Sequence, residues 1–260
     1  MTELTDYHMH SILSDGKDGY EEMIKAAVAK GFREIGFSDH LCLKPTRWAV
    51  SEVDIPVMTE QILELKAKYE SSISIKYGVE VDYFPEMESE IYHQIKALPV
   101  DYVIGSVHFI GDWNFDTDQS LYGKWSNDRL YEMYFERLQM AARSSLFDII
   151  GHLDLIKKFQ VYPESDQTDL IKKTLEIIRD SKLVVELNTS GLDRPCADFL
   201  PSGSIIAQCY HHHIPVILSS DAHSKSQIGR HFNSGLSLLK KTGFTQLVRF
   251  NQRRRSFVPL

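Results

Sequence analysis

Cysteine is scarce in this sequence. Only three cysteines occur among the 260 residues, and no two of them form a CxxC pair. Small disulfide-bonded scaffolds and thiolate zinc sites both need more, and more closely spaced, cysteines. We therefore exclude both classes and expect a protein of a reducing compartment, the cytoplasm. The three residues are Cys42, Cys196 and Cys209.

Long hydrophobic runs are missing as well. A helix that spans a bilayer needs about 20 consecutive apolar residues, whereas the apolar segments here are short, such as residues 214–218. No basic segment followed by an apolar run stands near the amino terminus, so we expect no cleaved signal peptide. The protein is not expected to be integral to a membrane.

Positive charge is in the minority. The chain has 36 acidic and 29 basic residues, which give a formal net charge of −7. A broad nucleic-acid-binding surface needs an excess of Lys and Arg, so we expect no nucleic-acid partner. A small anionic substrate in a local basic pocket remains compatible with this charge.

The sequence also contains no GxGxxG motif, no linker rich in Pro, Gly or Ser, and no long internal repeat. The missing glycine motif argues against a dinucleotide-binding fold. Because single α/β barrels commonly reach about 250 residues, we expect one domain over residues 1–260.

Short apolar runs alternate with amphipathic segments along the chain. This alternation predicts a parallel sheet covered by helices. About seven strands are expected, a number that suits a closed barrel better than a two-half dinucleotide fold. The predicted strands are a run around Tyr7 and residues 34–37, 73–81, 102–107, 147–150, 183–187 and 215–218. The predicted helices are residues 20–30, 58–69, 87–97, 128–143, 166–180, 202–210 and 227–241.

Six of the eleven histidines fall in or just after the predicted strands, and three acidic residues share this placement. The carboxyl ends of barrel strands meet at one face, so these residues should converge on one site. Nitrogen and carboxylate ligands suit Zn²⁺, Fe²⁺ or Mn²⁺, and nine ligands exceed the need of one ion. We expect two or three divalent ions. The nine residues are His8, His10, Asp15, His40, Glu80, His108, His152, Asp221 and His223.

Other interpretations exist for single members of this set. A lone His at a strand end is more often a hydrogen-bonded structural residue than a ligand. Asp15 is compatible with a simple turn in Ser14-Asp15-Gly16, and Glu80 with an ion pair. Outside the set, residues 211–213 are three histidines at a predicted helix end, and we interpret residues 253–255, three arginines, as a solvated tail.

Seven ordered segments resemble the motifs of the polymerase and histidinol phosphatase (PHP) domain family, of the histidinol-phosphate phosphatase type. The resemblance covers nearly the whole chain and implies a distorted (β/α)7 TIM-like barrel. It also implies hydrolysis of L-histidinol phosphate, a small phosphate monoester, to L-histidinol and phosphate, a step of histidine biosynthesis. The segments are residues 6–10 with 14–16, 36–40, 78–82, 104–108, 151–154, 186–191 and 219–223.

The resemblance further implies how the ligands divide among three ions, with a bridging hydroxide as the nucleophile. Glu80 would bridge the first two ions, and Asp221 or a water would protonate the leaving alkoxide. Asp15 stands where other family members have a histidine. The three sets are His8, His10, Glu80 and Asp221; then Glu80, His108 and His152; then Asp15, His40 and His223.

For the substrate, the sequence offers two cations and one irregular loop. Lys157 and Arg194 follow predicted strand ends, and we expect both to bind phosphate oxygens. Residues 111–124 form the longest irregular stretch, a candidate lid, and its acids Asp112, Asp116 and Asp118 could attract the substrate's ammonium group.

Three alternatives stay open at this point. One is a PHP phosphoesterase that acts on nucleotides or oligonucleotide ends, and another is a non-catalytic metal-binding domain. An amidohydrolase-type barrel also carries HxH on its first strand, but there a metal-bridging lysine would be expected where this chain has Glu80.

Overall fold

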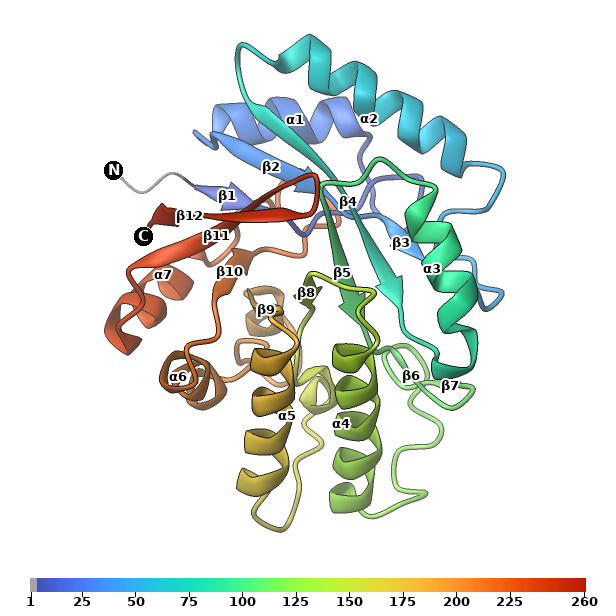
Figure 1. Cartoon of the computed structure of the whole chain (residues 1–260), viewed down its shortest axis with the longest axis vertical. Coiled ribbons are helices and arrows are strands. Elements are labelled where there is room, and N and C mark those ends of the chain that lie inside the picture. The colour runs from blue at the N-terminus through green and yellow to red at the C-terminus, as the bar shows by residue number, and fades with distance from the viewer. Residues whose placement is uncertain (1–3) are drawn as a thin grey trace.

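The computed structural model describes residues 4–260. Seven parallel strands form a nearly closed barrel, with the helices around it (Figure 1). The order around the barrel is that of the sequence: β1 (Thr5–Asp6), β2 (Glu34–Phe37), β4 (Ser74–Asp82), β5 (Tyr102–Ser106), β8 (Ile149–Ile150), β9 (Val184–Asn188) and β10 (Val216–Ser219). This architecture is the distorted (β/α)7 barrel, so the predicted fold is confirmed.

The barrel closes between the segments that follow its first and last strands. Met9 and Ala222 form an isolated parallel bridge. The His10 N–H donates to the Ala222 carbonyl at 2.9 Å, and the Ala222 N–H donates to the His8 carbonyl at 3.1 Å. Closure therefore occurs at the carboxyl ends of β1 and β10, beside the predicted ligands.

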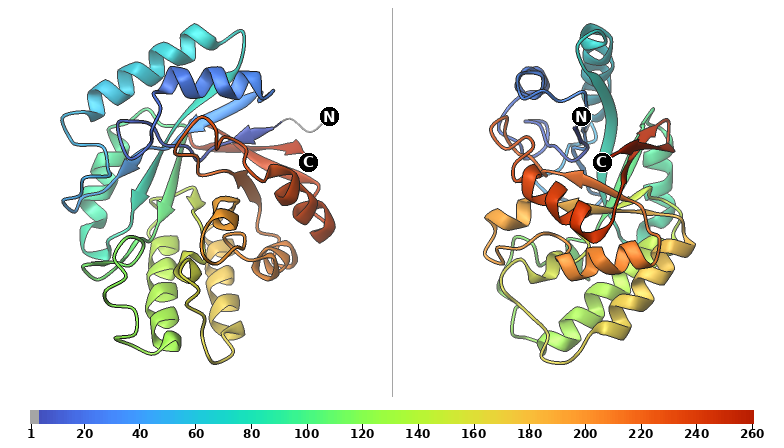
Figure 2. Two further views of the ribbon diagram at one scale, coloured as in Figure 1. Left: turned by 180° about the vertical axis from the view of Figure 1, so that it is seen from behind. Right: turned by 90° about the vertical axis from the view of Figure 1, so that its left-hand side faces the viewer.

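Within residues 4–260, seven α-helices connect the strands. They cover the outside of the barrel, as the two further views also show (Figure 2). Ser126 is the N-cap of α4, because its side chain accepts the Arg129 N–H at 3.3 Å. The helices are α1 (Tyr20–Ala29), α2 (Ile55–Tyr69), α3 (Glu88–Lys96), α4 (Asn127–Arg143), α5 (Thr168–Asp180), α6 (Gly203–His211) and α7 (Phe232–Thr242). Three short 3₁₀ helices are η1 (Pro85–Met87), η2 (Leu155–Lys157) and η3 (Ser190–Asp193).

The side chain of Tyr102 is buried in the interior of the barrel. The Tyr102 hydroxyl donates to the Tyr7 carbonyl at 2.6 Å and to the Phe37 carbonyl at 3.2 Å. Glycines at two neighbouring strand positions leave room for its ring, since a Cβ on Gly78 would lie 2.1 Å from Tyr102 Cζ and one on Gly36 2.3 Å from its hydroxyl.

Two differences from the sequence prediction bear on the site and on the opposite end of the barrel. Helix α7 begins at Phe232 instead of residue 227, because residues 224–231 form turns beside the site. The basic residues 253–255 are not a solvated tail. They belong to the hairpin of β11 (Gln246–Asn251) and β12 (Arg254–Pro259), whose Val248 and Phe250 cover the amino ends of the strands.

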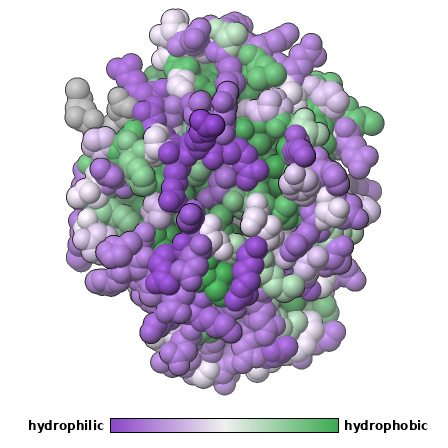
Figure 3. Space-filling model, in the orientation of Figure 1, coloured by the Kyte–Doolittle hydropathy of each residue, from purple (hydrophilic) through white to green (hydrophobic). Residues whose placement is uncertain are grey.

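Three further short strands lie outside the barrel order. β3 (His40–Leu41) pairs with β4, and β6 (Phe109–Ile110) forms a hairpin with β7 (Trp113–Asn114). Hydrophilic side chains cover much of the face in Figure 3, with hydrophobic residues between them. Among the described residues, no helix is long and apolar enough to cross a membrane.

Candidate metal centre

Elements that are far apart in the sequence bring the nine predicted ligands to one end of the barrel. His8 and His10 follow β1, and Glu80 lies within β4. Asp221 and His223 follow β10, where Asp221 has a φ of +50°. Asp6 fixes this last turn by accepting the Ser220 N–H at 3.0 Å and the Ser220 hydroxyl. The remaining ligands are Asp15 in the loop before α1, His40 in β3, His108 after β5 and His152 after β8.

Glu80 lies at the centre of this group, and its carboxylate is 1% exposed. Its Oε2 is 3.1 Å from His8 Nε2 and 2.9 Å from His40 Nδ1. Its Oε1 is 2.9 Å from His152 Nε2 and 3.7 Å from His108 Nε2. One carboxylate thus faces imidazoles from four different segments, which is the geometry of a residue able to bridge two ions.

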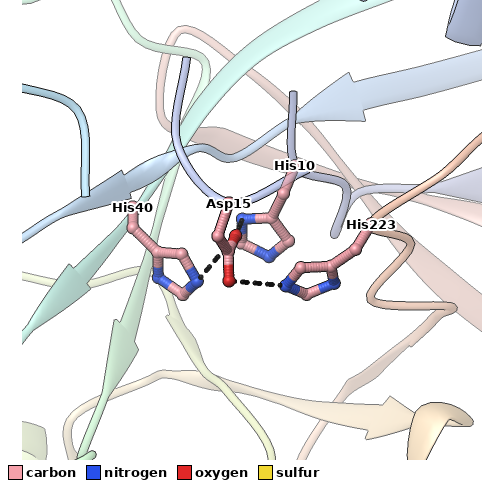
Figure 4. Close-up of side chains that lie close together, drawn as sticks. All are labelled: His10, Asp15, His40 and His223. Atoms are coloured by element: carbon pink, nitrogen blue, oxygen red, sulfur yellow. Dashed lines mark hydrogen bonds and ion pairs between the residues drawn. The ribbon is translucent and has the colours of Figure 1, made fainter. Parts of the chain in front are cut away.

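Asp15 forms a second centre nearer to the solvent. Its carboxylate lies between the rings of three histidines (Figure 4). Oδ1 is 3.6 Å from His40 Nε2 and 3.9 Å from His10 Nδ1, and Oδ2 is 3.1 Å from His223 Nε2. An aspartate therefore completes a cluster with three histidines in this chain.

Asp221 joins the two centres. Its Oδ1 is 3.4 Å from both His10 Nε2 and His223 Nδ1, and 3.8 Å from His8 Nε2. The other oxygen, Oδ2, accepts hydrogen bonds of 3.2 Å from Asn188 Nδ2 and the Ser190 hydroxyl. These two donors fix the carboxylate so that Oδ1 stays directed at the histidines.

The ligand atoms fit divalent ions because several of them are buried and, although other polar atoms lie nearby, form no hydrogen bond of acceptable geometry with any described residue. A buried polar atom without a partner costs about 1–3 kcal/mol, and a coordinated ion removes that cost. The unpartnered atoms here are His8 Nε2, both ring nitrogens of His10, His40 Nδ1, Glu80 Oε2 and His152 Nδ1. Nitrogen and carboxylate donors without thiolates match Zn²⁺, Fe²⁺ or Mn²⁺.

Three groups of side chains place their ligand atoms within 4.8 Å of one another. The first group lies within the first predicted ligand set, and the second contains the whole third set together with His10. In the third group His40 joins Glu80 and His108, while His152 approaches Glu80 from the other side. The groups are His8, His10 and Glu80; His10, Asp15, His40 and His223; and His40, Glu80 and His108.

Two carboxylates behind the histidines were not singled out from the sequence. Glu186 Oε1 accepts from His8 Nδ1 at 2.6 Å, and its Oε2 accepts the His152 N–H at 2.7 Å. Asp82 Oδ1 lies 2.9 Å from His108 Nδ1. The bonds to the Nδ1 atoms of His8 and His108 fix these two rings so that Nε2 points into the centre, as outer carboxylates do around protein metal sites. The available signal was an acid within an apolar strand, two residues after Glu80 in the case of Asp82.

Burial and neighbouring charges shift the pKa values of these groups in the ion-free protein. Burial alone would raise the pKa of Glu80, but His40 and His8 hold it well below its ordinary value. Burial lowers the pKa of His10 to about 4, with a further contribution from His40 and His223. His10 is therefore neutral at physiological pH, the form in which an imidazole binds a metal ion.

A cavity of about 630 Å³ opens onto the centre. Four cations line it, and two of them already have acidic partners. Lys158 binds Asp116, and Arg230 pairs with Asp193 at 3.3 Å. The cationic groups of the other two, Lys17 and Arg194, have no partner among residues 4–260.

Lys157 does not line this cavity. Its side chain is 4% exposed, and its ammonium group lies 2.8 Å from Asp154 and 2.7 Å from Asp198. These two ion pairs attach η2 to the segment before α6, which is a structural role. The next residue, Lys158, is the lysine of this segment that reaches the cavity. Residue spacing alone could not separate the two, because their directions depend on the turns of a 3₁₀ helix.

Comparisons with known proteins agree with this geometry. The model of the PHP domain matches residues 6–190. A probable histidinol-phosphatase of Deinococcus radiodurans is 30% identical over 260 residues, which cover 98% of this chain and 99% of that protein. The histidinol-phosphatase of Lactococcus lactis is 26% identical over 253 residues, 95% of this chain and 94% of its own.

A solved structure has the same fold. The crystal structure of histidinol phosphate phosphatase from Lactococcus lactis, in complex with zinc, L-histidinol and phosphate, superposes with a TM-score of 0.87. It is 24% identical in sequence, and the match covers 98% of this chain and 99% of that one. The similarity thus extends through the whole barrel, including the segments that carry the nine residues.

Proposed function

This chain belongs to the PHP domain family, and we propose that it is a metal-dependent phosphatase that hydrolyses L-histidinol phosphate to L-histidinol and phosphate. The observation that carries the proposal is the set of buried, unpartnered nitrogen and carboxylate atoms around Glu80 at the base of a cavity with free cationic groups. The names of the full-length relatives support the choice of substrate.

We assign the nine ligands to three ions. When bound, divalent Zn, Fe or Mn ions would supply a hydroxide nucleophile at neutral pH and neutralise the charge of the phosphoryl group. Glu80 would bridge the first two ions, which its position among four imidazoles supports. The assigned sets are His8, His10, Glu80 and Asp221; Glu80, His108 and His152; and Asp15, His40 and His223.

Asp221 is suited to move a proton during the reaction. Burial would raise its pKa, but the neighbouring imidazoles of His8, His10 and His223 hold the pKa well below its ordinary value. Because the carboxylate is ionised, it can accept the proton that a water loses when it becomes the hydroxide nucleophile. It can then deliver that proton to the alkoxide of the departing L-histidinol as the ester P–O bond breaks.

Arg194 is suited to bind the phosphate. Its guanidinium lines the cavity and has no acidic partner among the described residues. A forked donor of this kind can hold two phosphate oxygens at once and keep the phosphorus oriented for in-line attack. Lys17 lines the same cavity beside Asp15 and adds a second unpaired positive charge.

The test is phosphate release by the Zn²⁺- or Mn²⁺-loaded protein from L-histidinol phosphate, a nucleoside monophosphate and an aryl phosphate. We expect kcat/KM for L-histidinol phosphate to exceed the other two by orders of magnitude. A preference for the nucleotide would favour a nucleotide or oligonucleotide phosphoesterase. No release from any ester, with the ions bound, would favour a non-catalytic metal-binding domain.

A further inference from the structure

One carboxylate in the cavity is neither a predicted metal ligand nor a partner of Arg230. Five carboxylates line the cavity: Asp15, Glu80, Asp116, Asp193 and Asp221. Three of them are in the metal centre, and Asp193 pairs with Arg230 and His231. Asp116 remains, on the segment between β7 and α4.

The backbone holds Asp116 in place beside the metal centre. The Phe115 N–H donates to the His108 carbonyl at 3.1 Å, and the Phe115 ring is fully buried against Tyr134. Asn114 Oδ1 accepts the Asp116 N–H at 3.1 Å. Asp116 is therefore fixed next to His108, a residue that we assign to the second ion, and it is not on a freely moving loop.

Lys158 fixes the side chain of Asp116 but occupies only one of its oxygens. Lys158 Nζ donates to Asp116 Oδ1 at 2.6 Å and to the Asp116 carbonyl at 3.0 Å. The Asp116 side chain is 21% exposed, and Oδ2 has no hydrogen-bond partner among residues 4–260. One carboxylate oxygen is thus available to a ligand in the cavity.

A free carboxylate oxygen is unfavourable for a ligand that carries only negative charge. A phosphate dianion bound nearby would be repelled by Asp116. The same oxygen becomes favourable when the ligand has a positive group close to its phosphate. In L-histidinol phosphate the ammonium stands on the carbon next to the phosphorylated carbon, so it lies a few bonds from the phosphorus.

We propose that Asp116 binds the ammonium group of the substrate and so selects phosphate monoesters with an ammonium on the carbon next to the phosphorylated one. This inference rests on the proposed phosphatase function of the same cavity. Lys158 acts as a positioning residue that keeps Oδ1 occupied and leaves Oδ2 for the substrate. Asp112 and Asp118 have no such role, since neither lines the cavity.

The test compares L-histidinol phosphate with its des-amino analogue, 3-(imidazol-4-yl)propyl phosphate, on the metal-loaded wild type and on Asp116→Asn. We expect the wild type to prefer the ammonium-bearing ester by about 10- to 100-fold in kcat/KM, as for a charged hydrogen bond in a closed site. In Asp116→Asn this preference should fall to about two-fold, because kcat/KM falls for the ammonium-bearing ester and stays equal or rises for the analogue, which the carboxylate no longer repels.

Two results would overturn the inference. One is a wild-type enzyme that cleaves both esters equally well. The other is an Asp116→Asn variant that loses activity on both esters by the same factor, since that is the behaviour of a residue that only shapes the loop. Asp118→Asn, from the same segment, and Asp112→Asn, from the turn between β6 and β7, are matched controls, and both should keep the wild-type ratio.

Failure of the proposed function gives a different pattern. If neither imidazole ester is cleaved while another phosphate ester is, the substrate assignment is wrong. The charge preference is then measured with 2-aminoethyl phosphate against ethyl phosphate. A loss of that preference in Asp116→Asn would support the role of Asp116, and equal rates in the wild type would refute it.

Discussion

At the scale of single residues, the centre depends on carboxylates that face away from the cavity as much as on those that face it. Glu186 contacts His8 with one oxygen and the backbone of His152 with the other. It also accepts a hydrogen bond from Ser219. This one side chain therefore fixes ligands from two different strand ends.

Glu186→Gln tests that role. The amide keeps the shape but removes the charge that orients His8, so we expect metal affinity to fall by about 10- to 100-fold. Competition with a chromophoric chelator would measure the affinity. Glu90→Gln, an exposed acid on α3, is the control and should leave the affinity unchanged. A wild-type metal affinity in Glu186→Gln would show that the charge of Glu186 does not support metal binding.

Arg194→Ala tests the phosphate contact. Because the unpaired guanidinium is expected to bind phosphate oxygens, its loss should lower kcat/KM for phosphate release by about 10-fold or more, while metal content stays constant. Lys157→Met is the informative comparison. The ion pairs of Lys157 lie outside the cavity, so the variant Lys157→Met should lower the melting temperature more than the catalytic rate. Unchanged kinetics in Arg194→Ala would contradict the assignment.

The pKa of His108 predicts proton release on metal binding. Burial alone would lower this pKa, but Asp82 and Glu80, with Asp116, raise it to about 10 in the ion-free protein. The ring is therefore protonated at pH 7.5 and must lose its proton to bind an ion. Affinity for the ion at His108 should rise with pH up to about 10. Calorimetry in two buffers of different ionisation enthalpy would count the protons, and a count of zero would refute the prediction.

At the scale of elements, the hairpin β11–β12 stabilises the end of the barrel opposite the site. Its Arg253 donates to Asp148, just before β8, at 2.8 and 3.2 Å, and to the Leu146 carbonyl at 2.8 Å. The Gln252 N–H donates to Asp101, just before β5, at 3.1 Å. The hairpin thus connects the amino ends of strands that are distant in the sequence.

Arg253→Ala should separate stability from function. The Arg253 side chain is about one-third exposed, so we expect the loss of its ion pair to lower the free energy of unfolding by about 1–2 kcal/mol. Urea unfolding would measure it. Metal content and kcat should stay at wild-type values, because the contact lies at the far end. Arg254→Ala, an exposed neighbour, should change stability by less than about 0.5 kcal/mol. A loss of bound metal in Arg253→Ala would contradict this separation.

The elements also indicate what the sequence could predict and what it could not. The barrel strands were predictable because each is a buried apolar run between amphipathic helices, as in 34–37 and 102–106. The hairpin at residues 246–259 was not, because its alternation of polar and apolar residues is weak and its turn consists of Gln252 and Arg253, neither of which is a typical turn residue. The hairpin packs on Tyr7 and Tyr102, and these two side chains come together only when the barrel closes.

The same limit applies to the site. Ligands at strand ends follow from the parallel topology, so nine residues could be named in advance. The choice between Lys157 and Lys158, or among Asp112, Asp116 and Asp118, depends on turns whose directions have no periodic signal. What separates them is the cavity, which Lys158 and Asp116 line and which Lys157, Asp112 and Asp118 do not.

At the scale of the whole molecule, barrel closure and metal binding involve the same segments. The bridge of Met9 with Ala222 lies between His8 and His10 on one side and Asp221 and His223 on the other. Bound ions would link the first and last strands that this bridge brings together. Binding to the folded state alone also stabilises it, by about 2.7 kcal/mol at a free concentration 100 times Kd. Metal loading should therefore make the barrel resist unfolding as well as make it active.

The most direct test is a titration of the metal-stripped protein with Zn²⁺ or Mn²⁺ that follows bound ions and phosphate release from L-histidinol phosphate together. We expect no release without ions, little at one ion per chain, and full activity only at two to three ions per chain. Full activity at one ion, or activity that persists in the stripped protein, would contradict a multinuclear phosphatase centre built around Glu80.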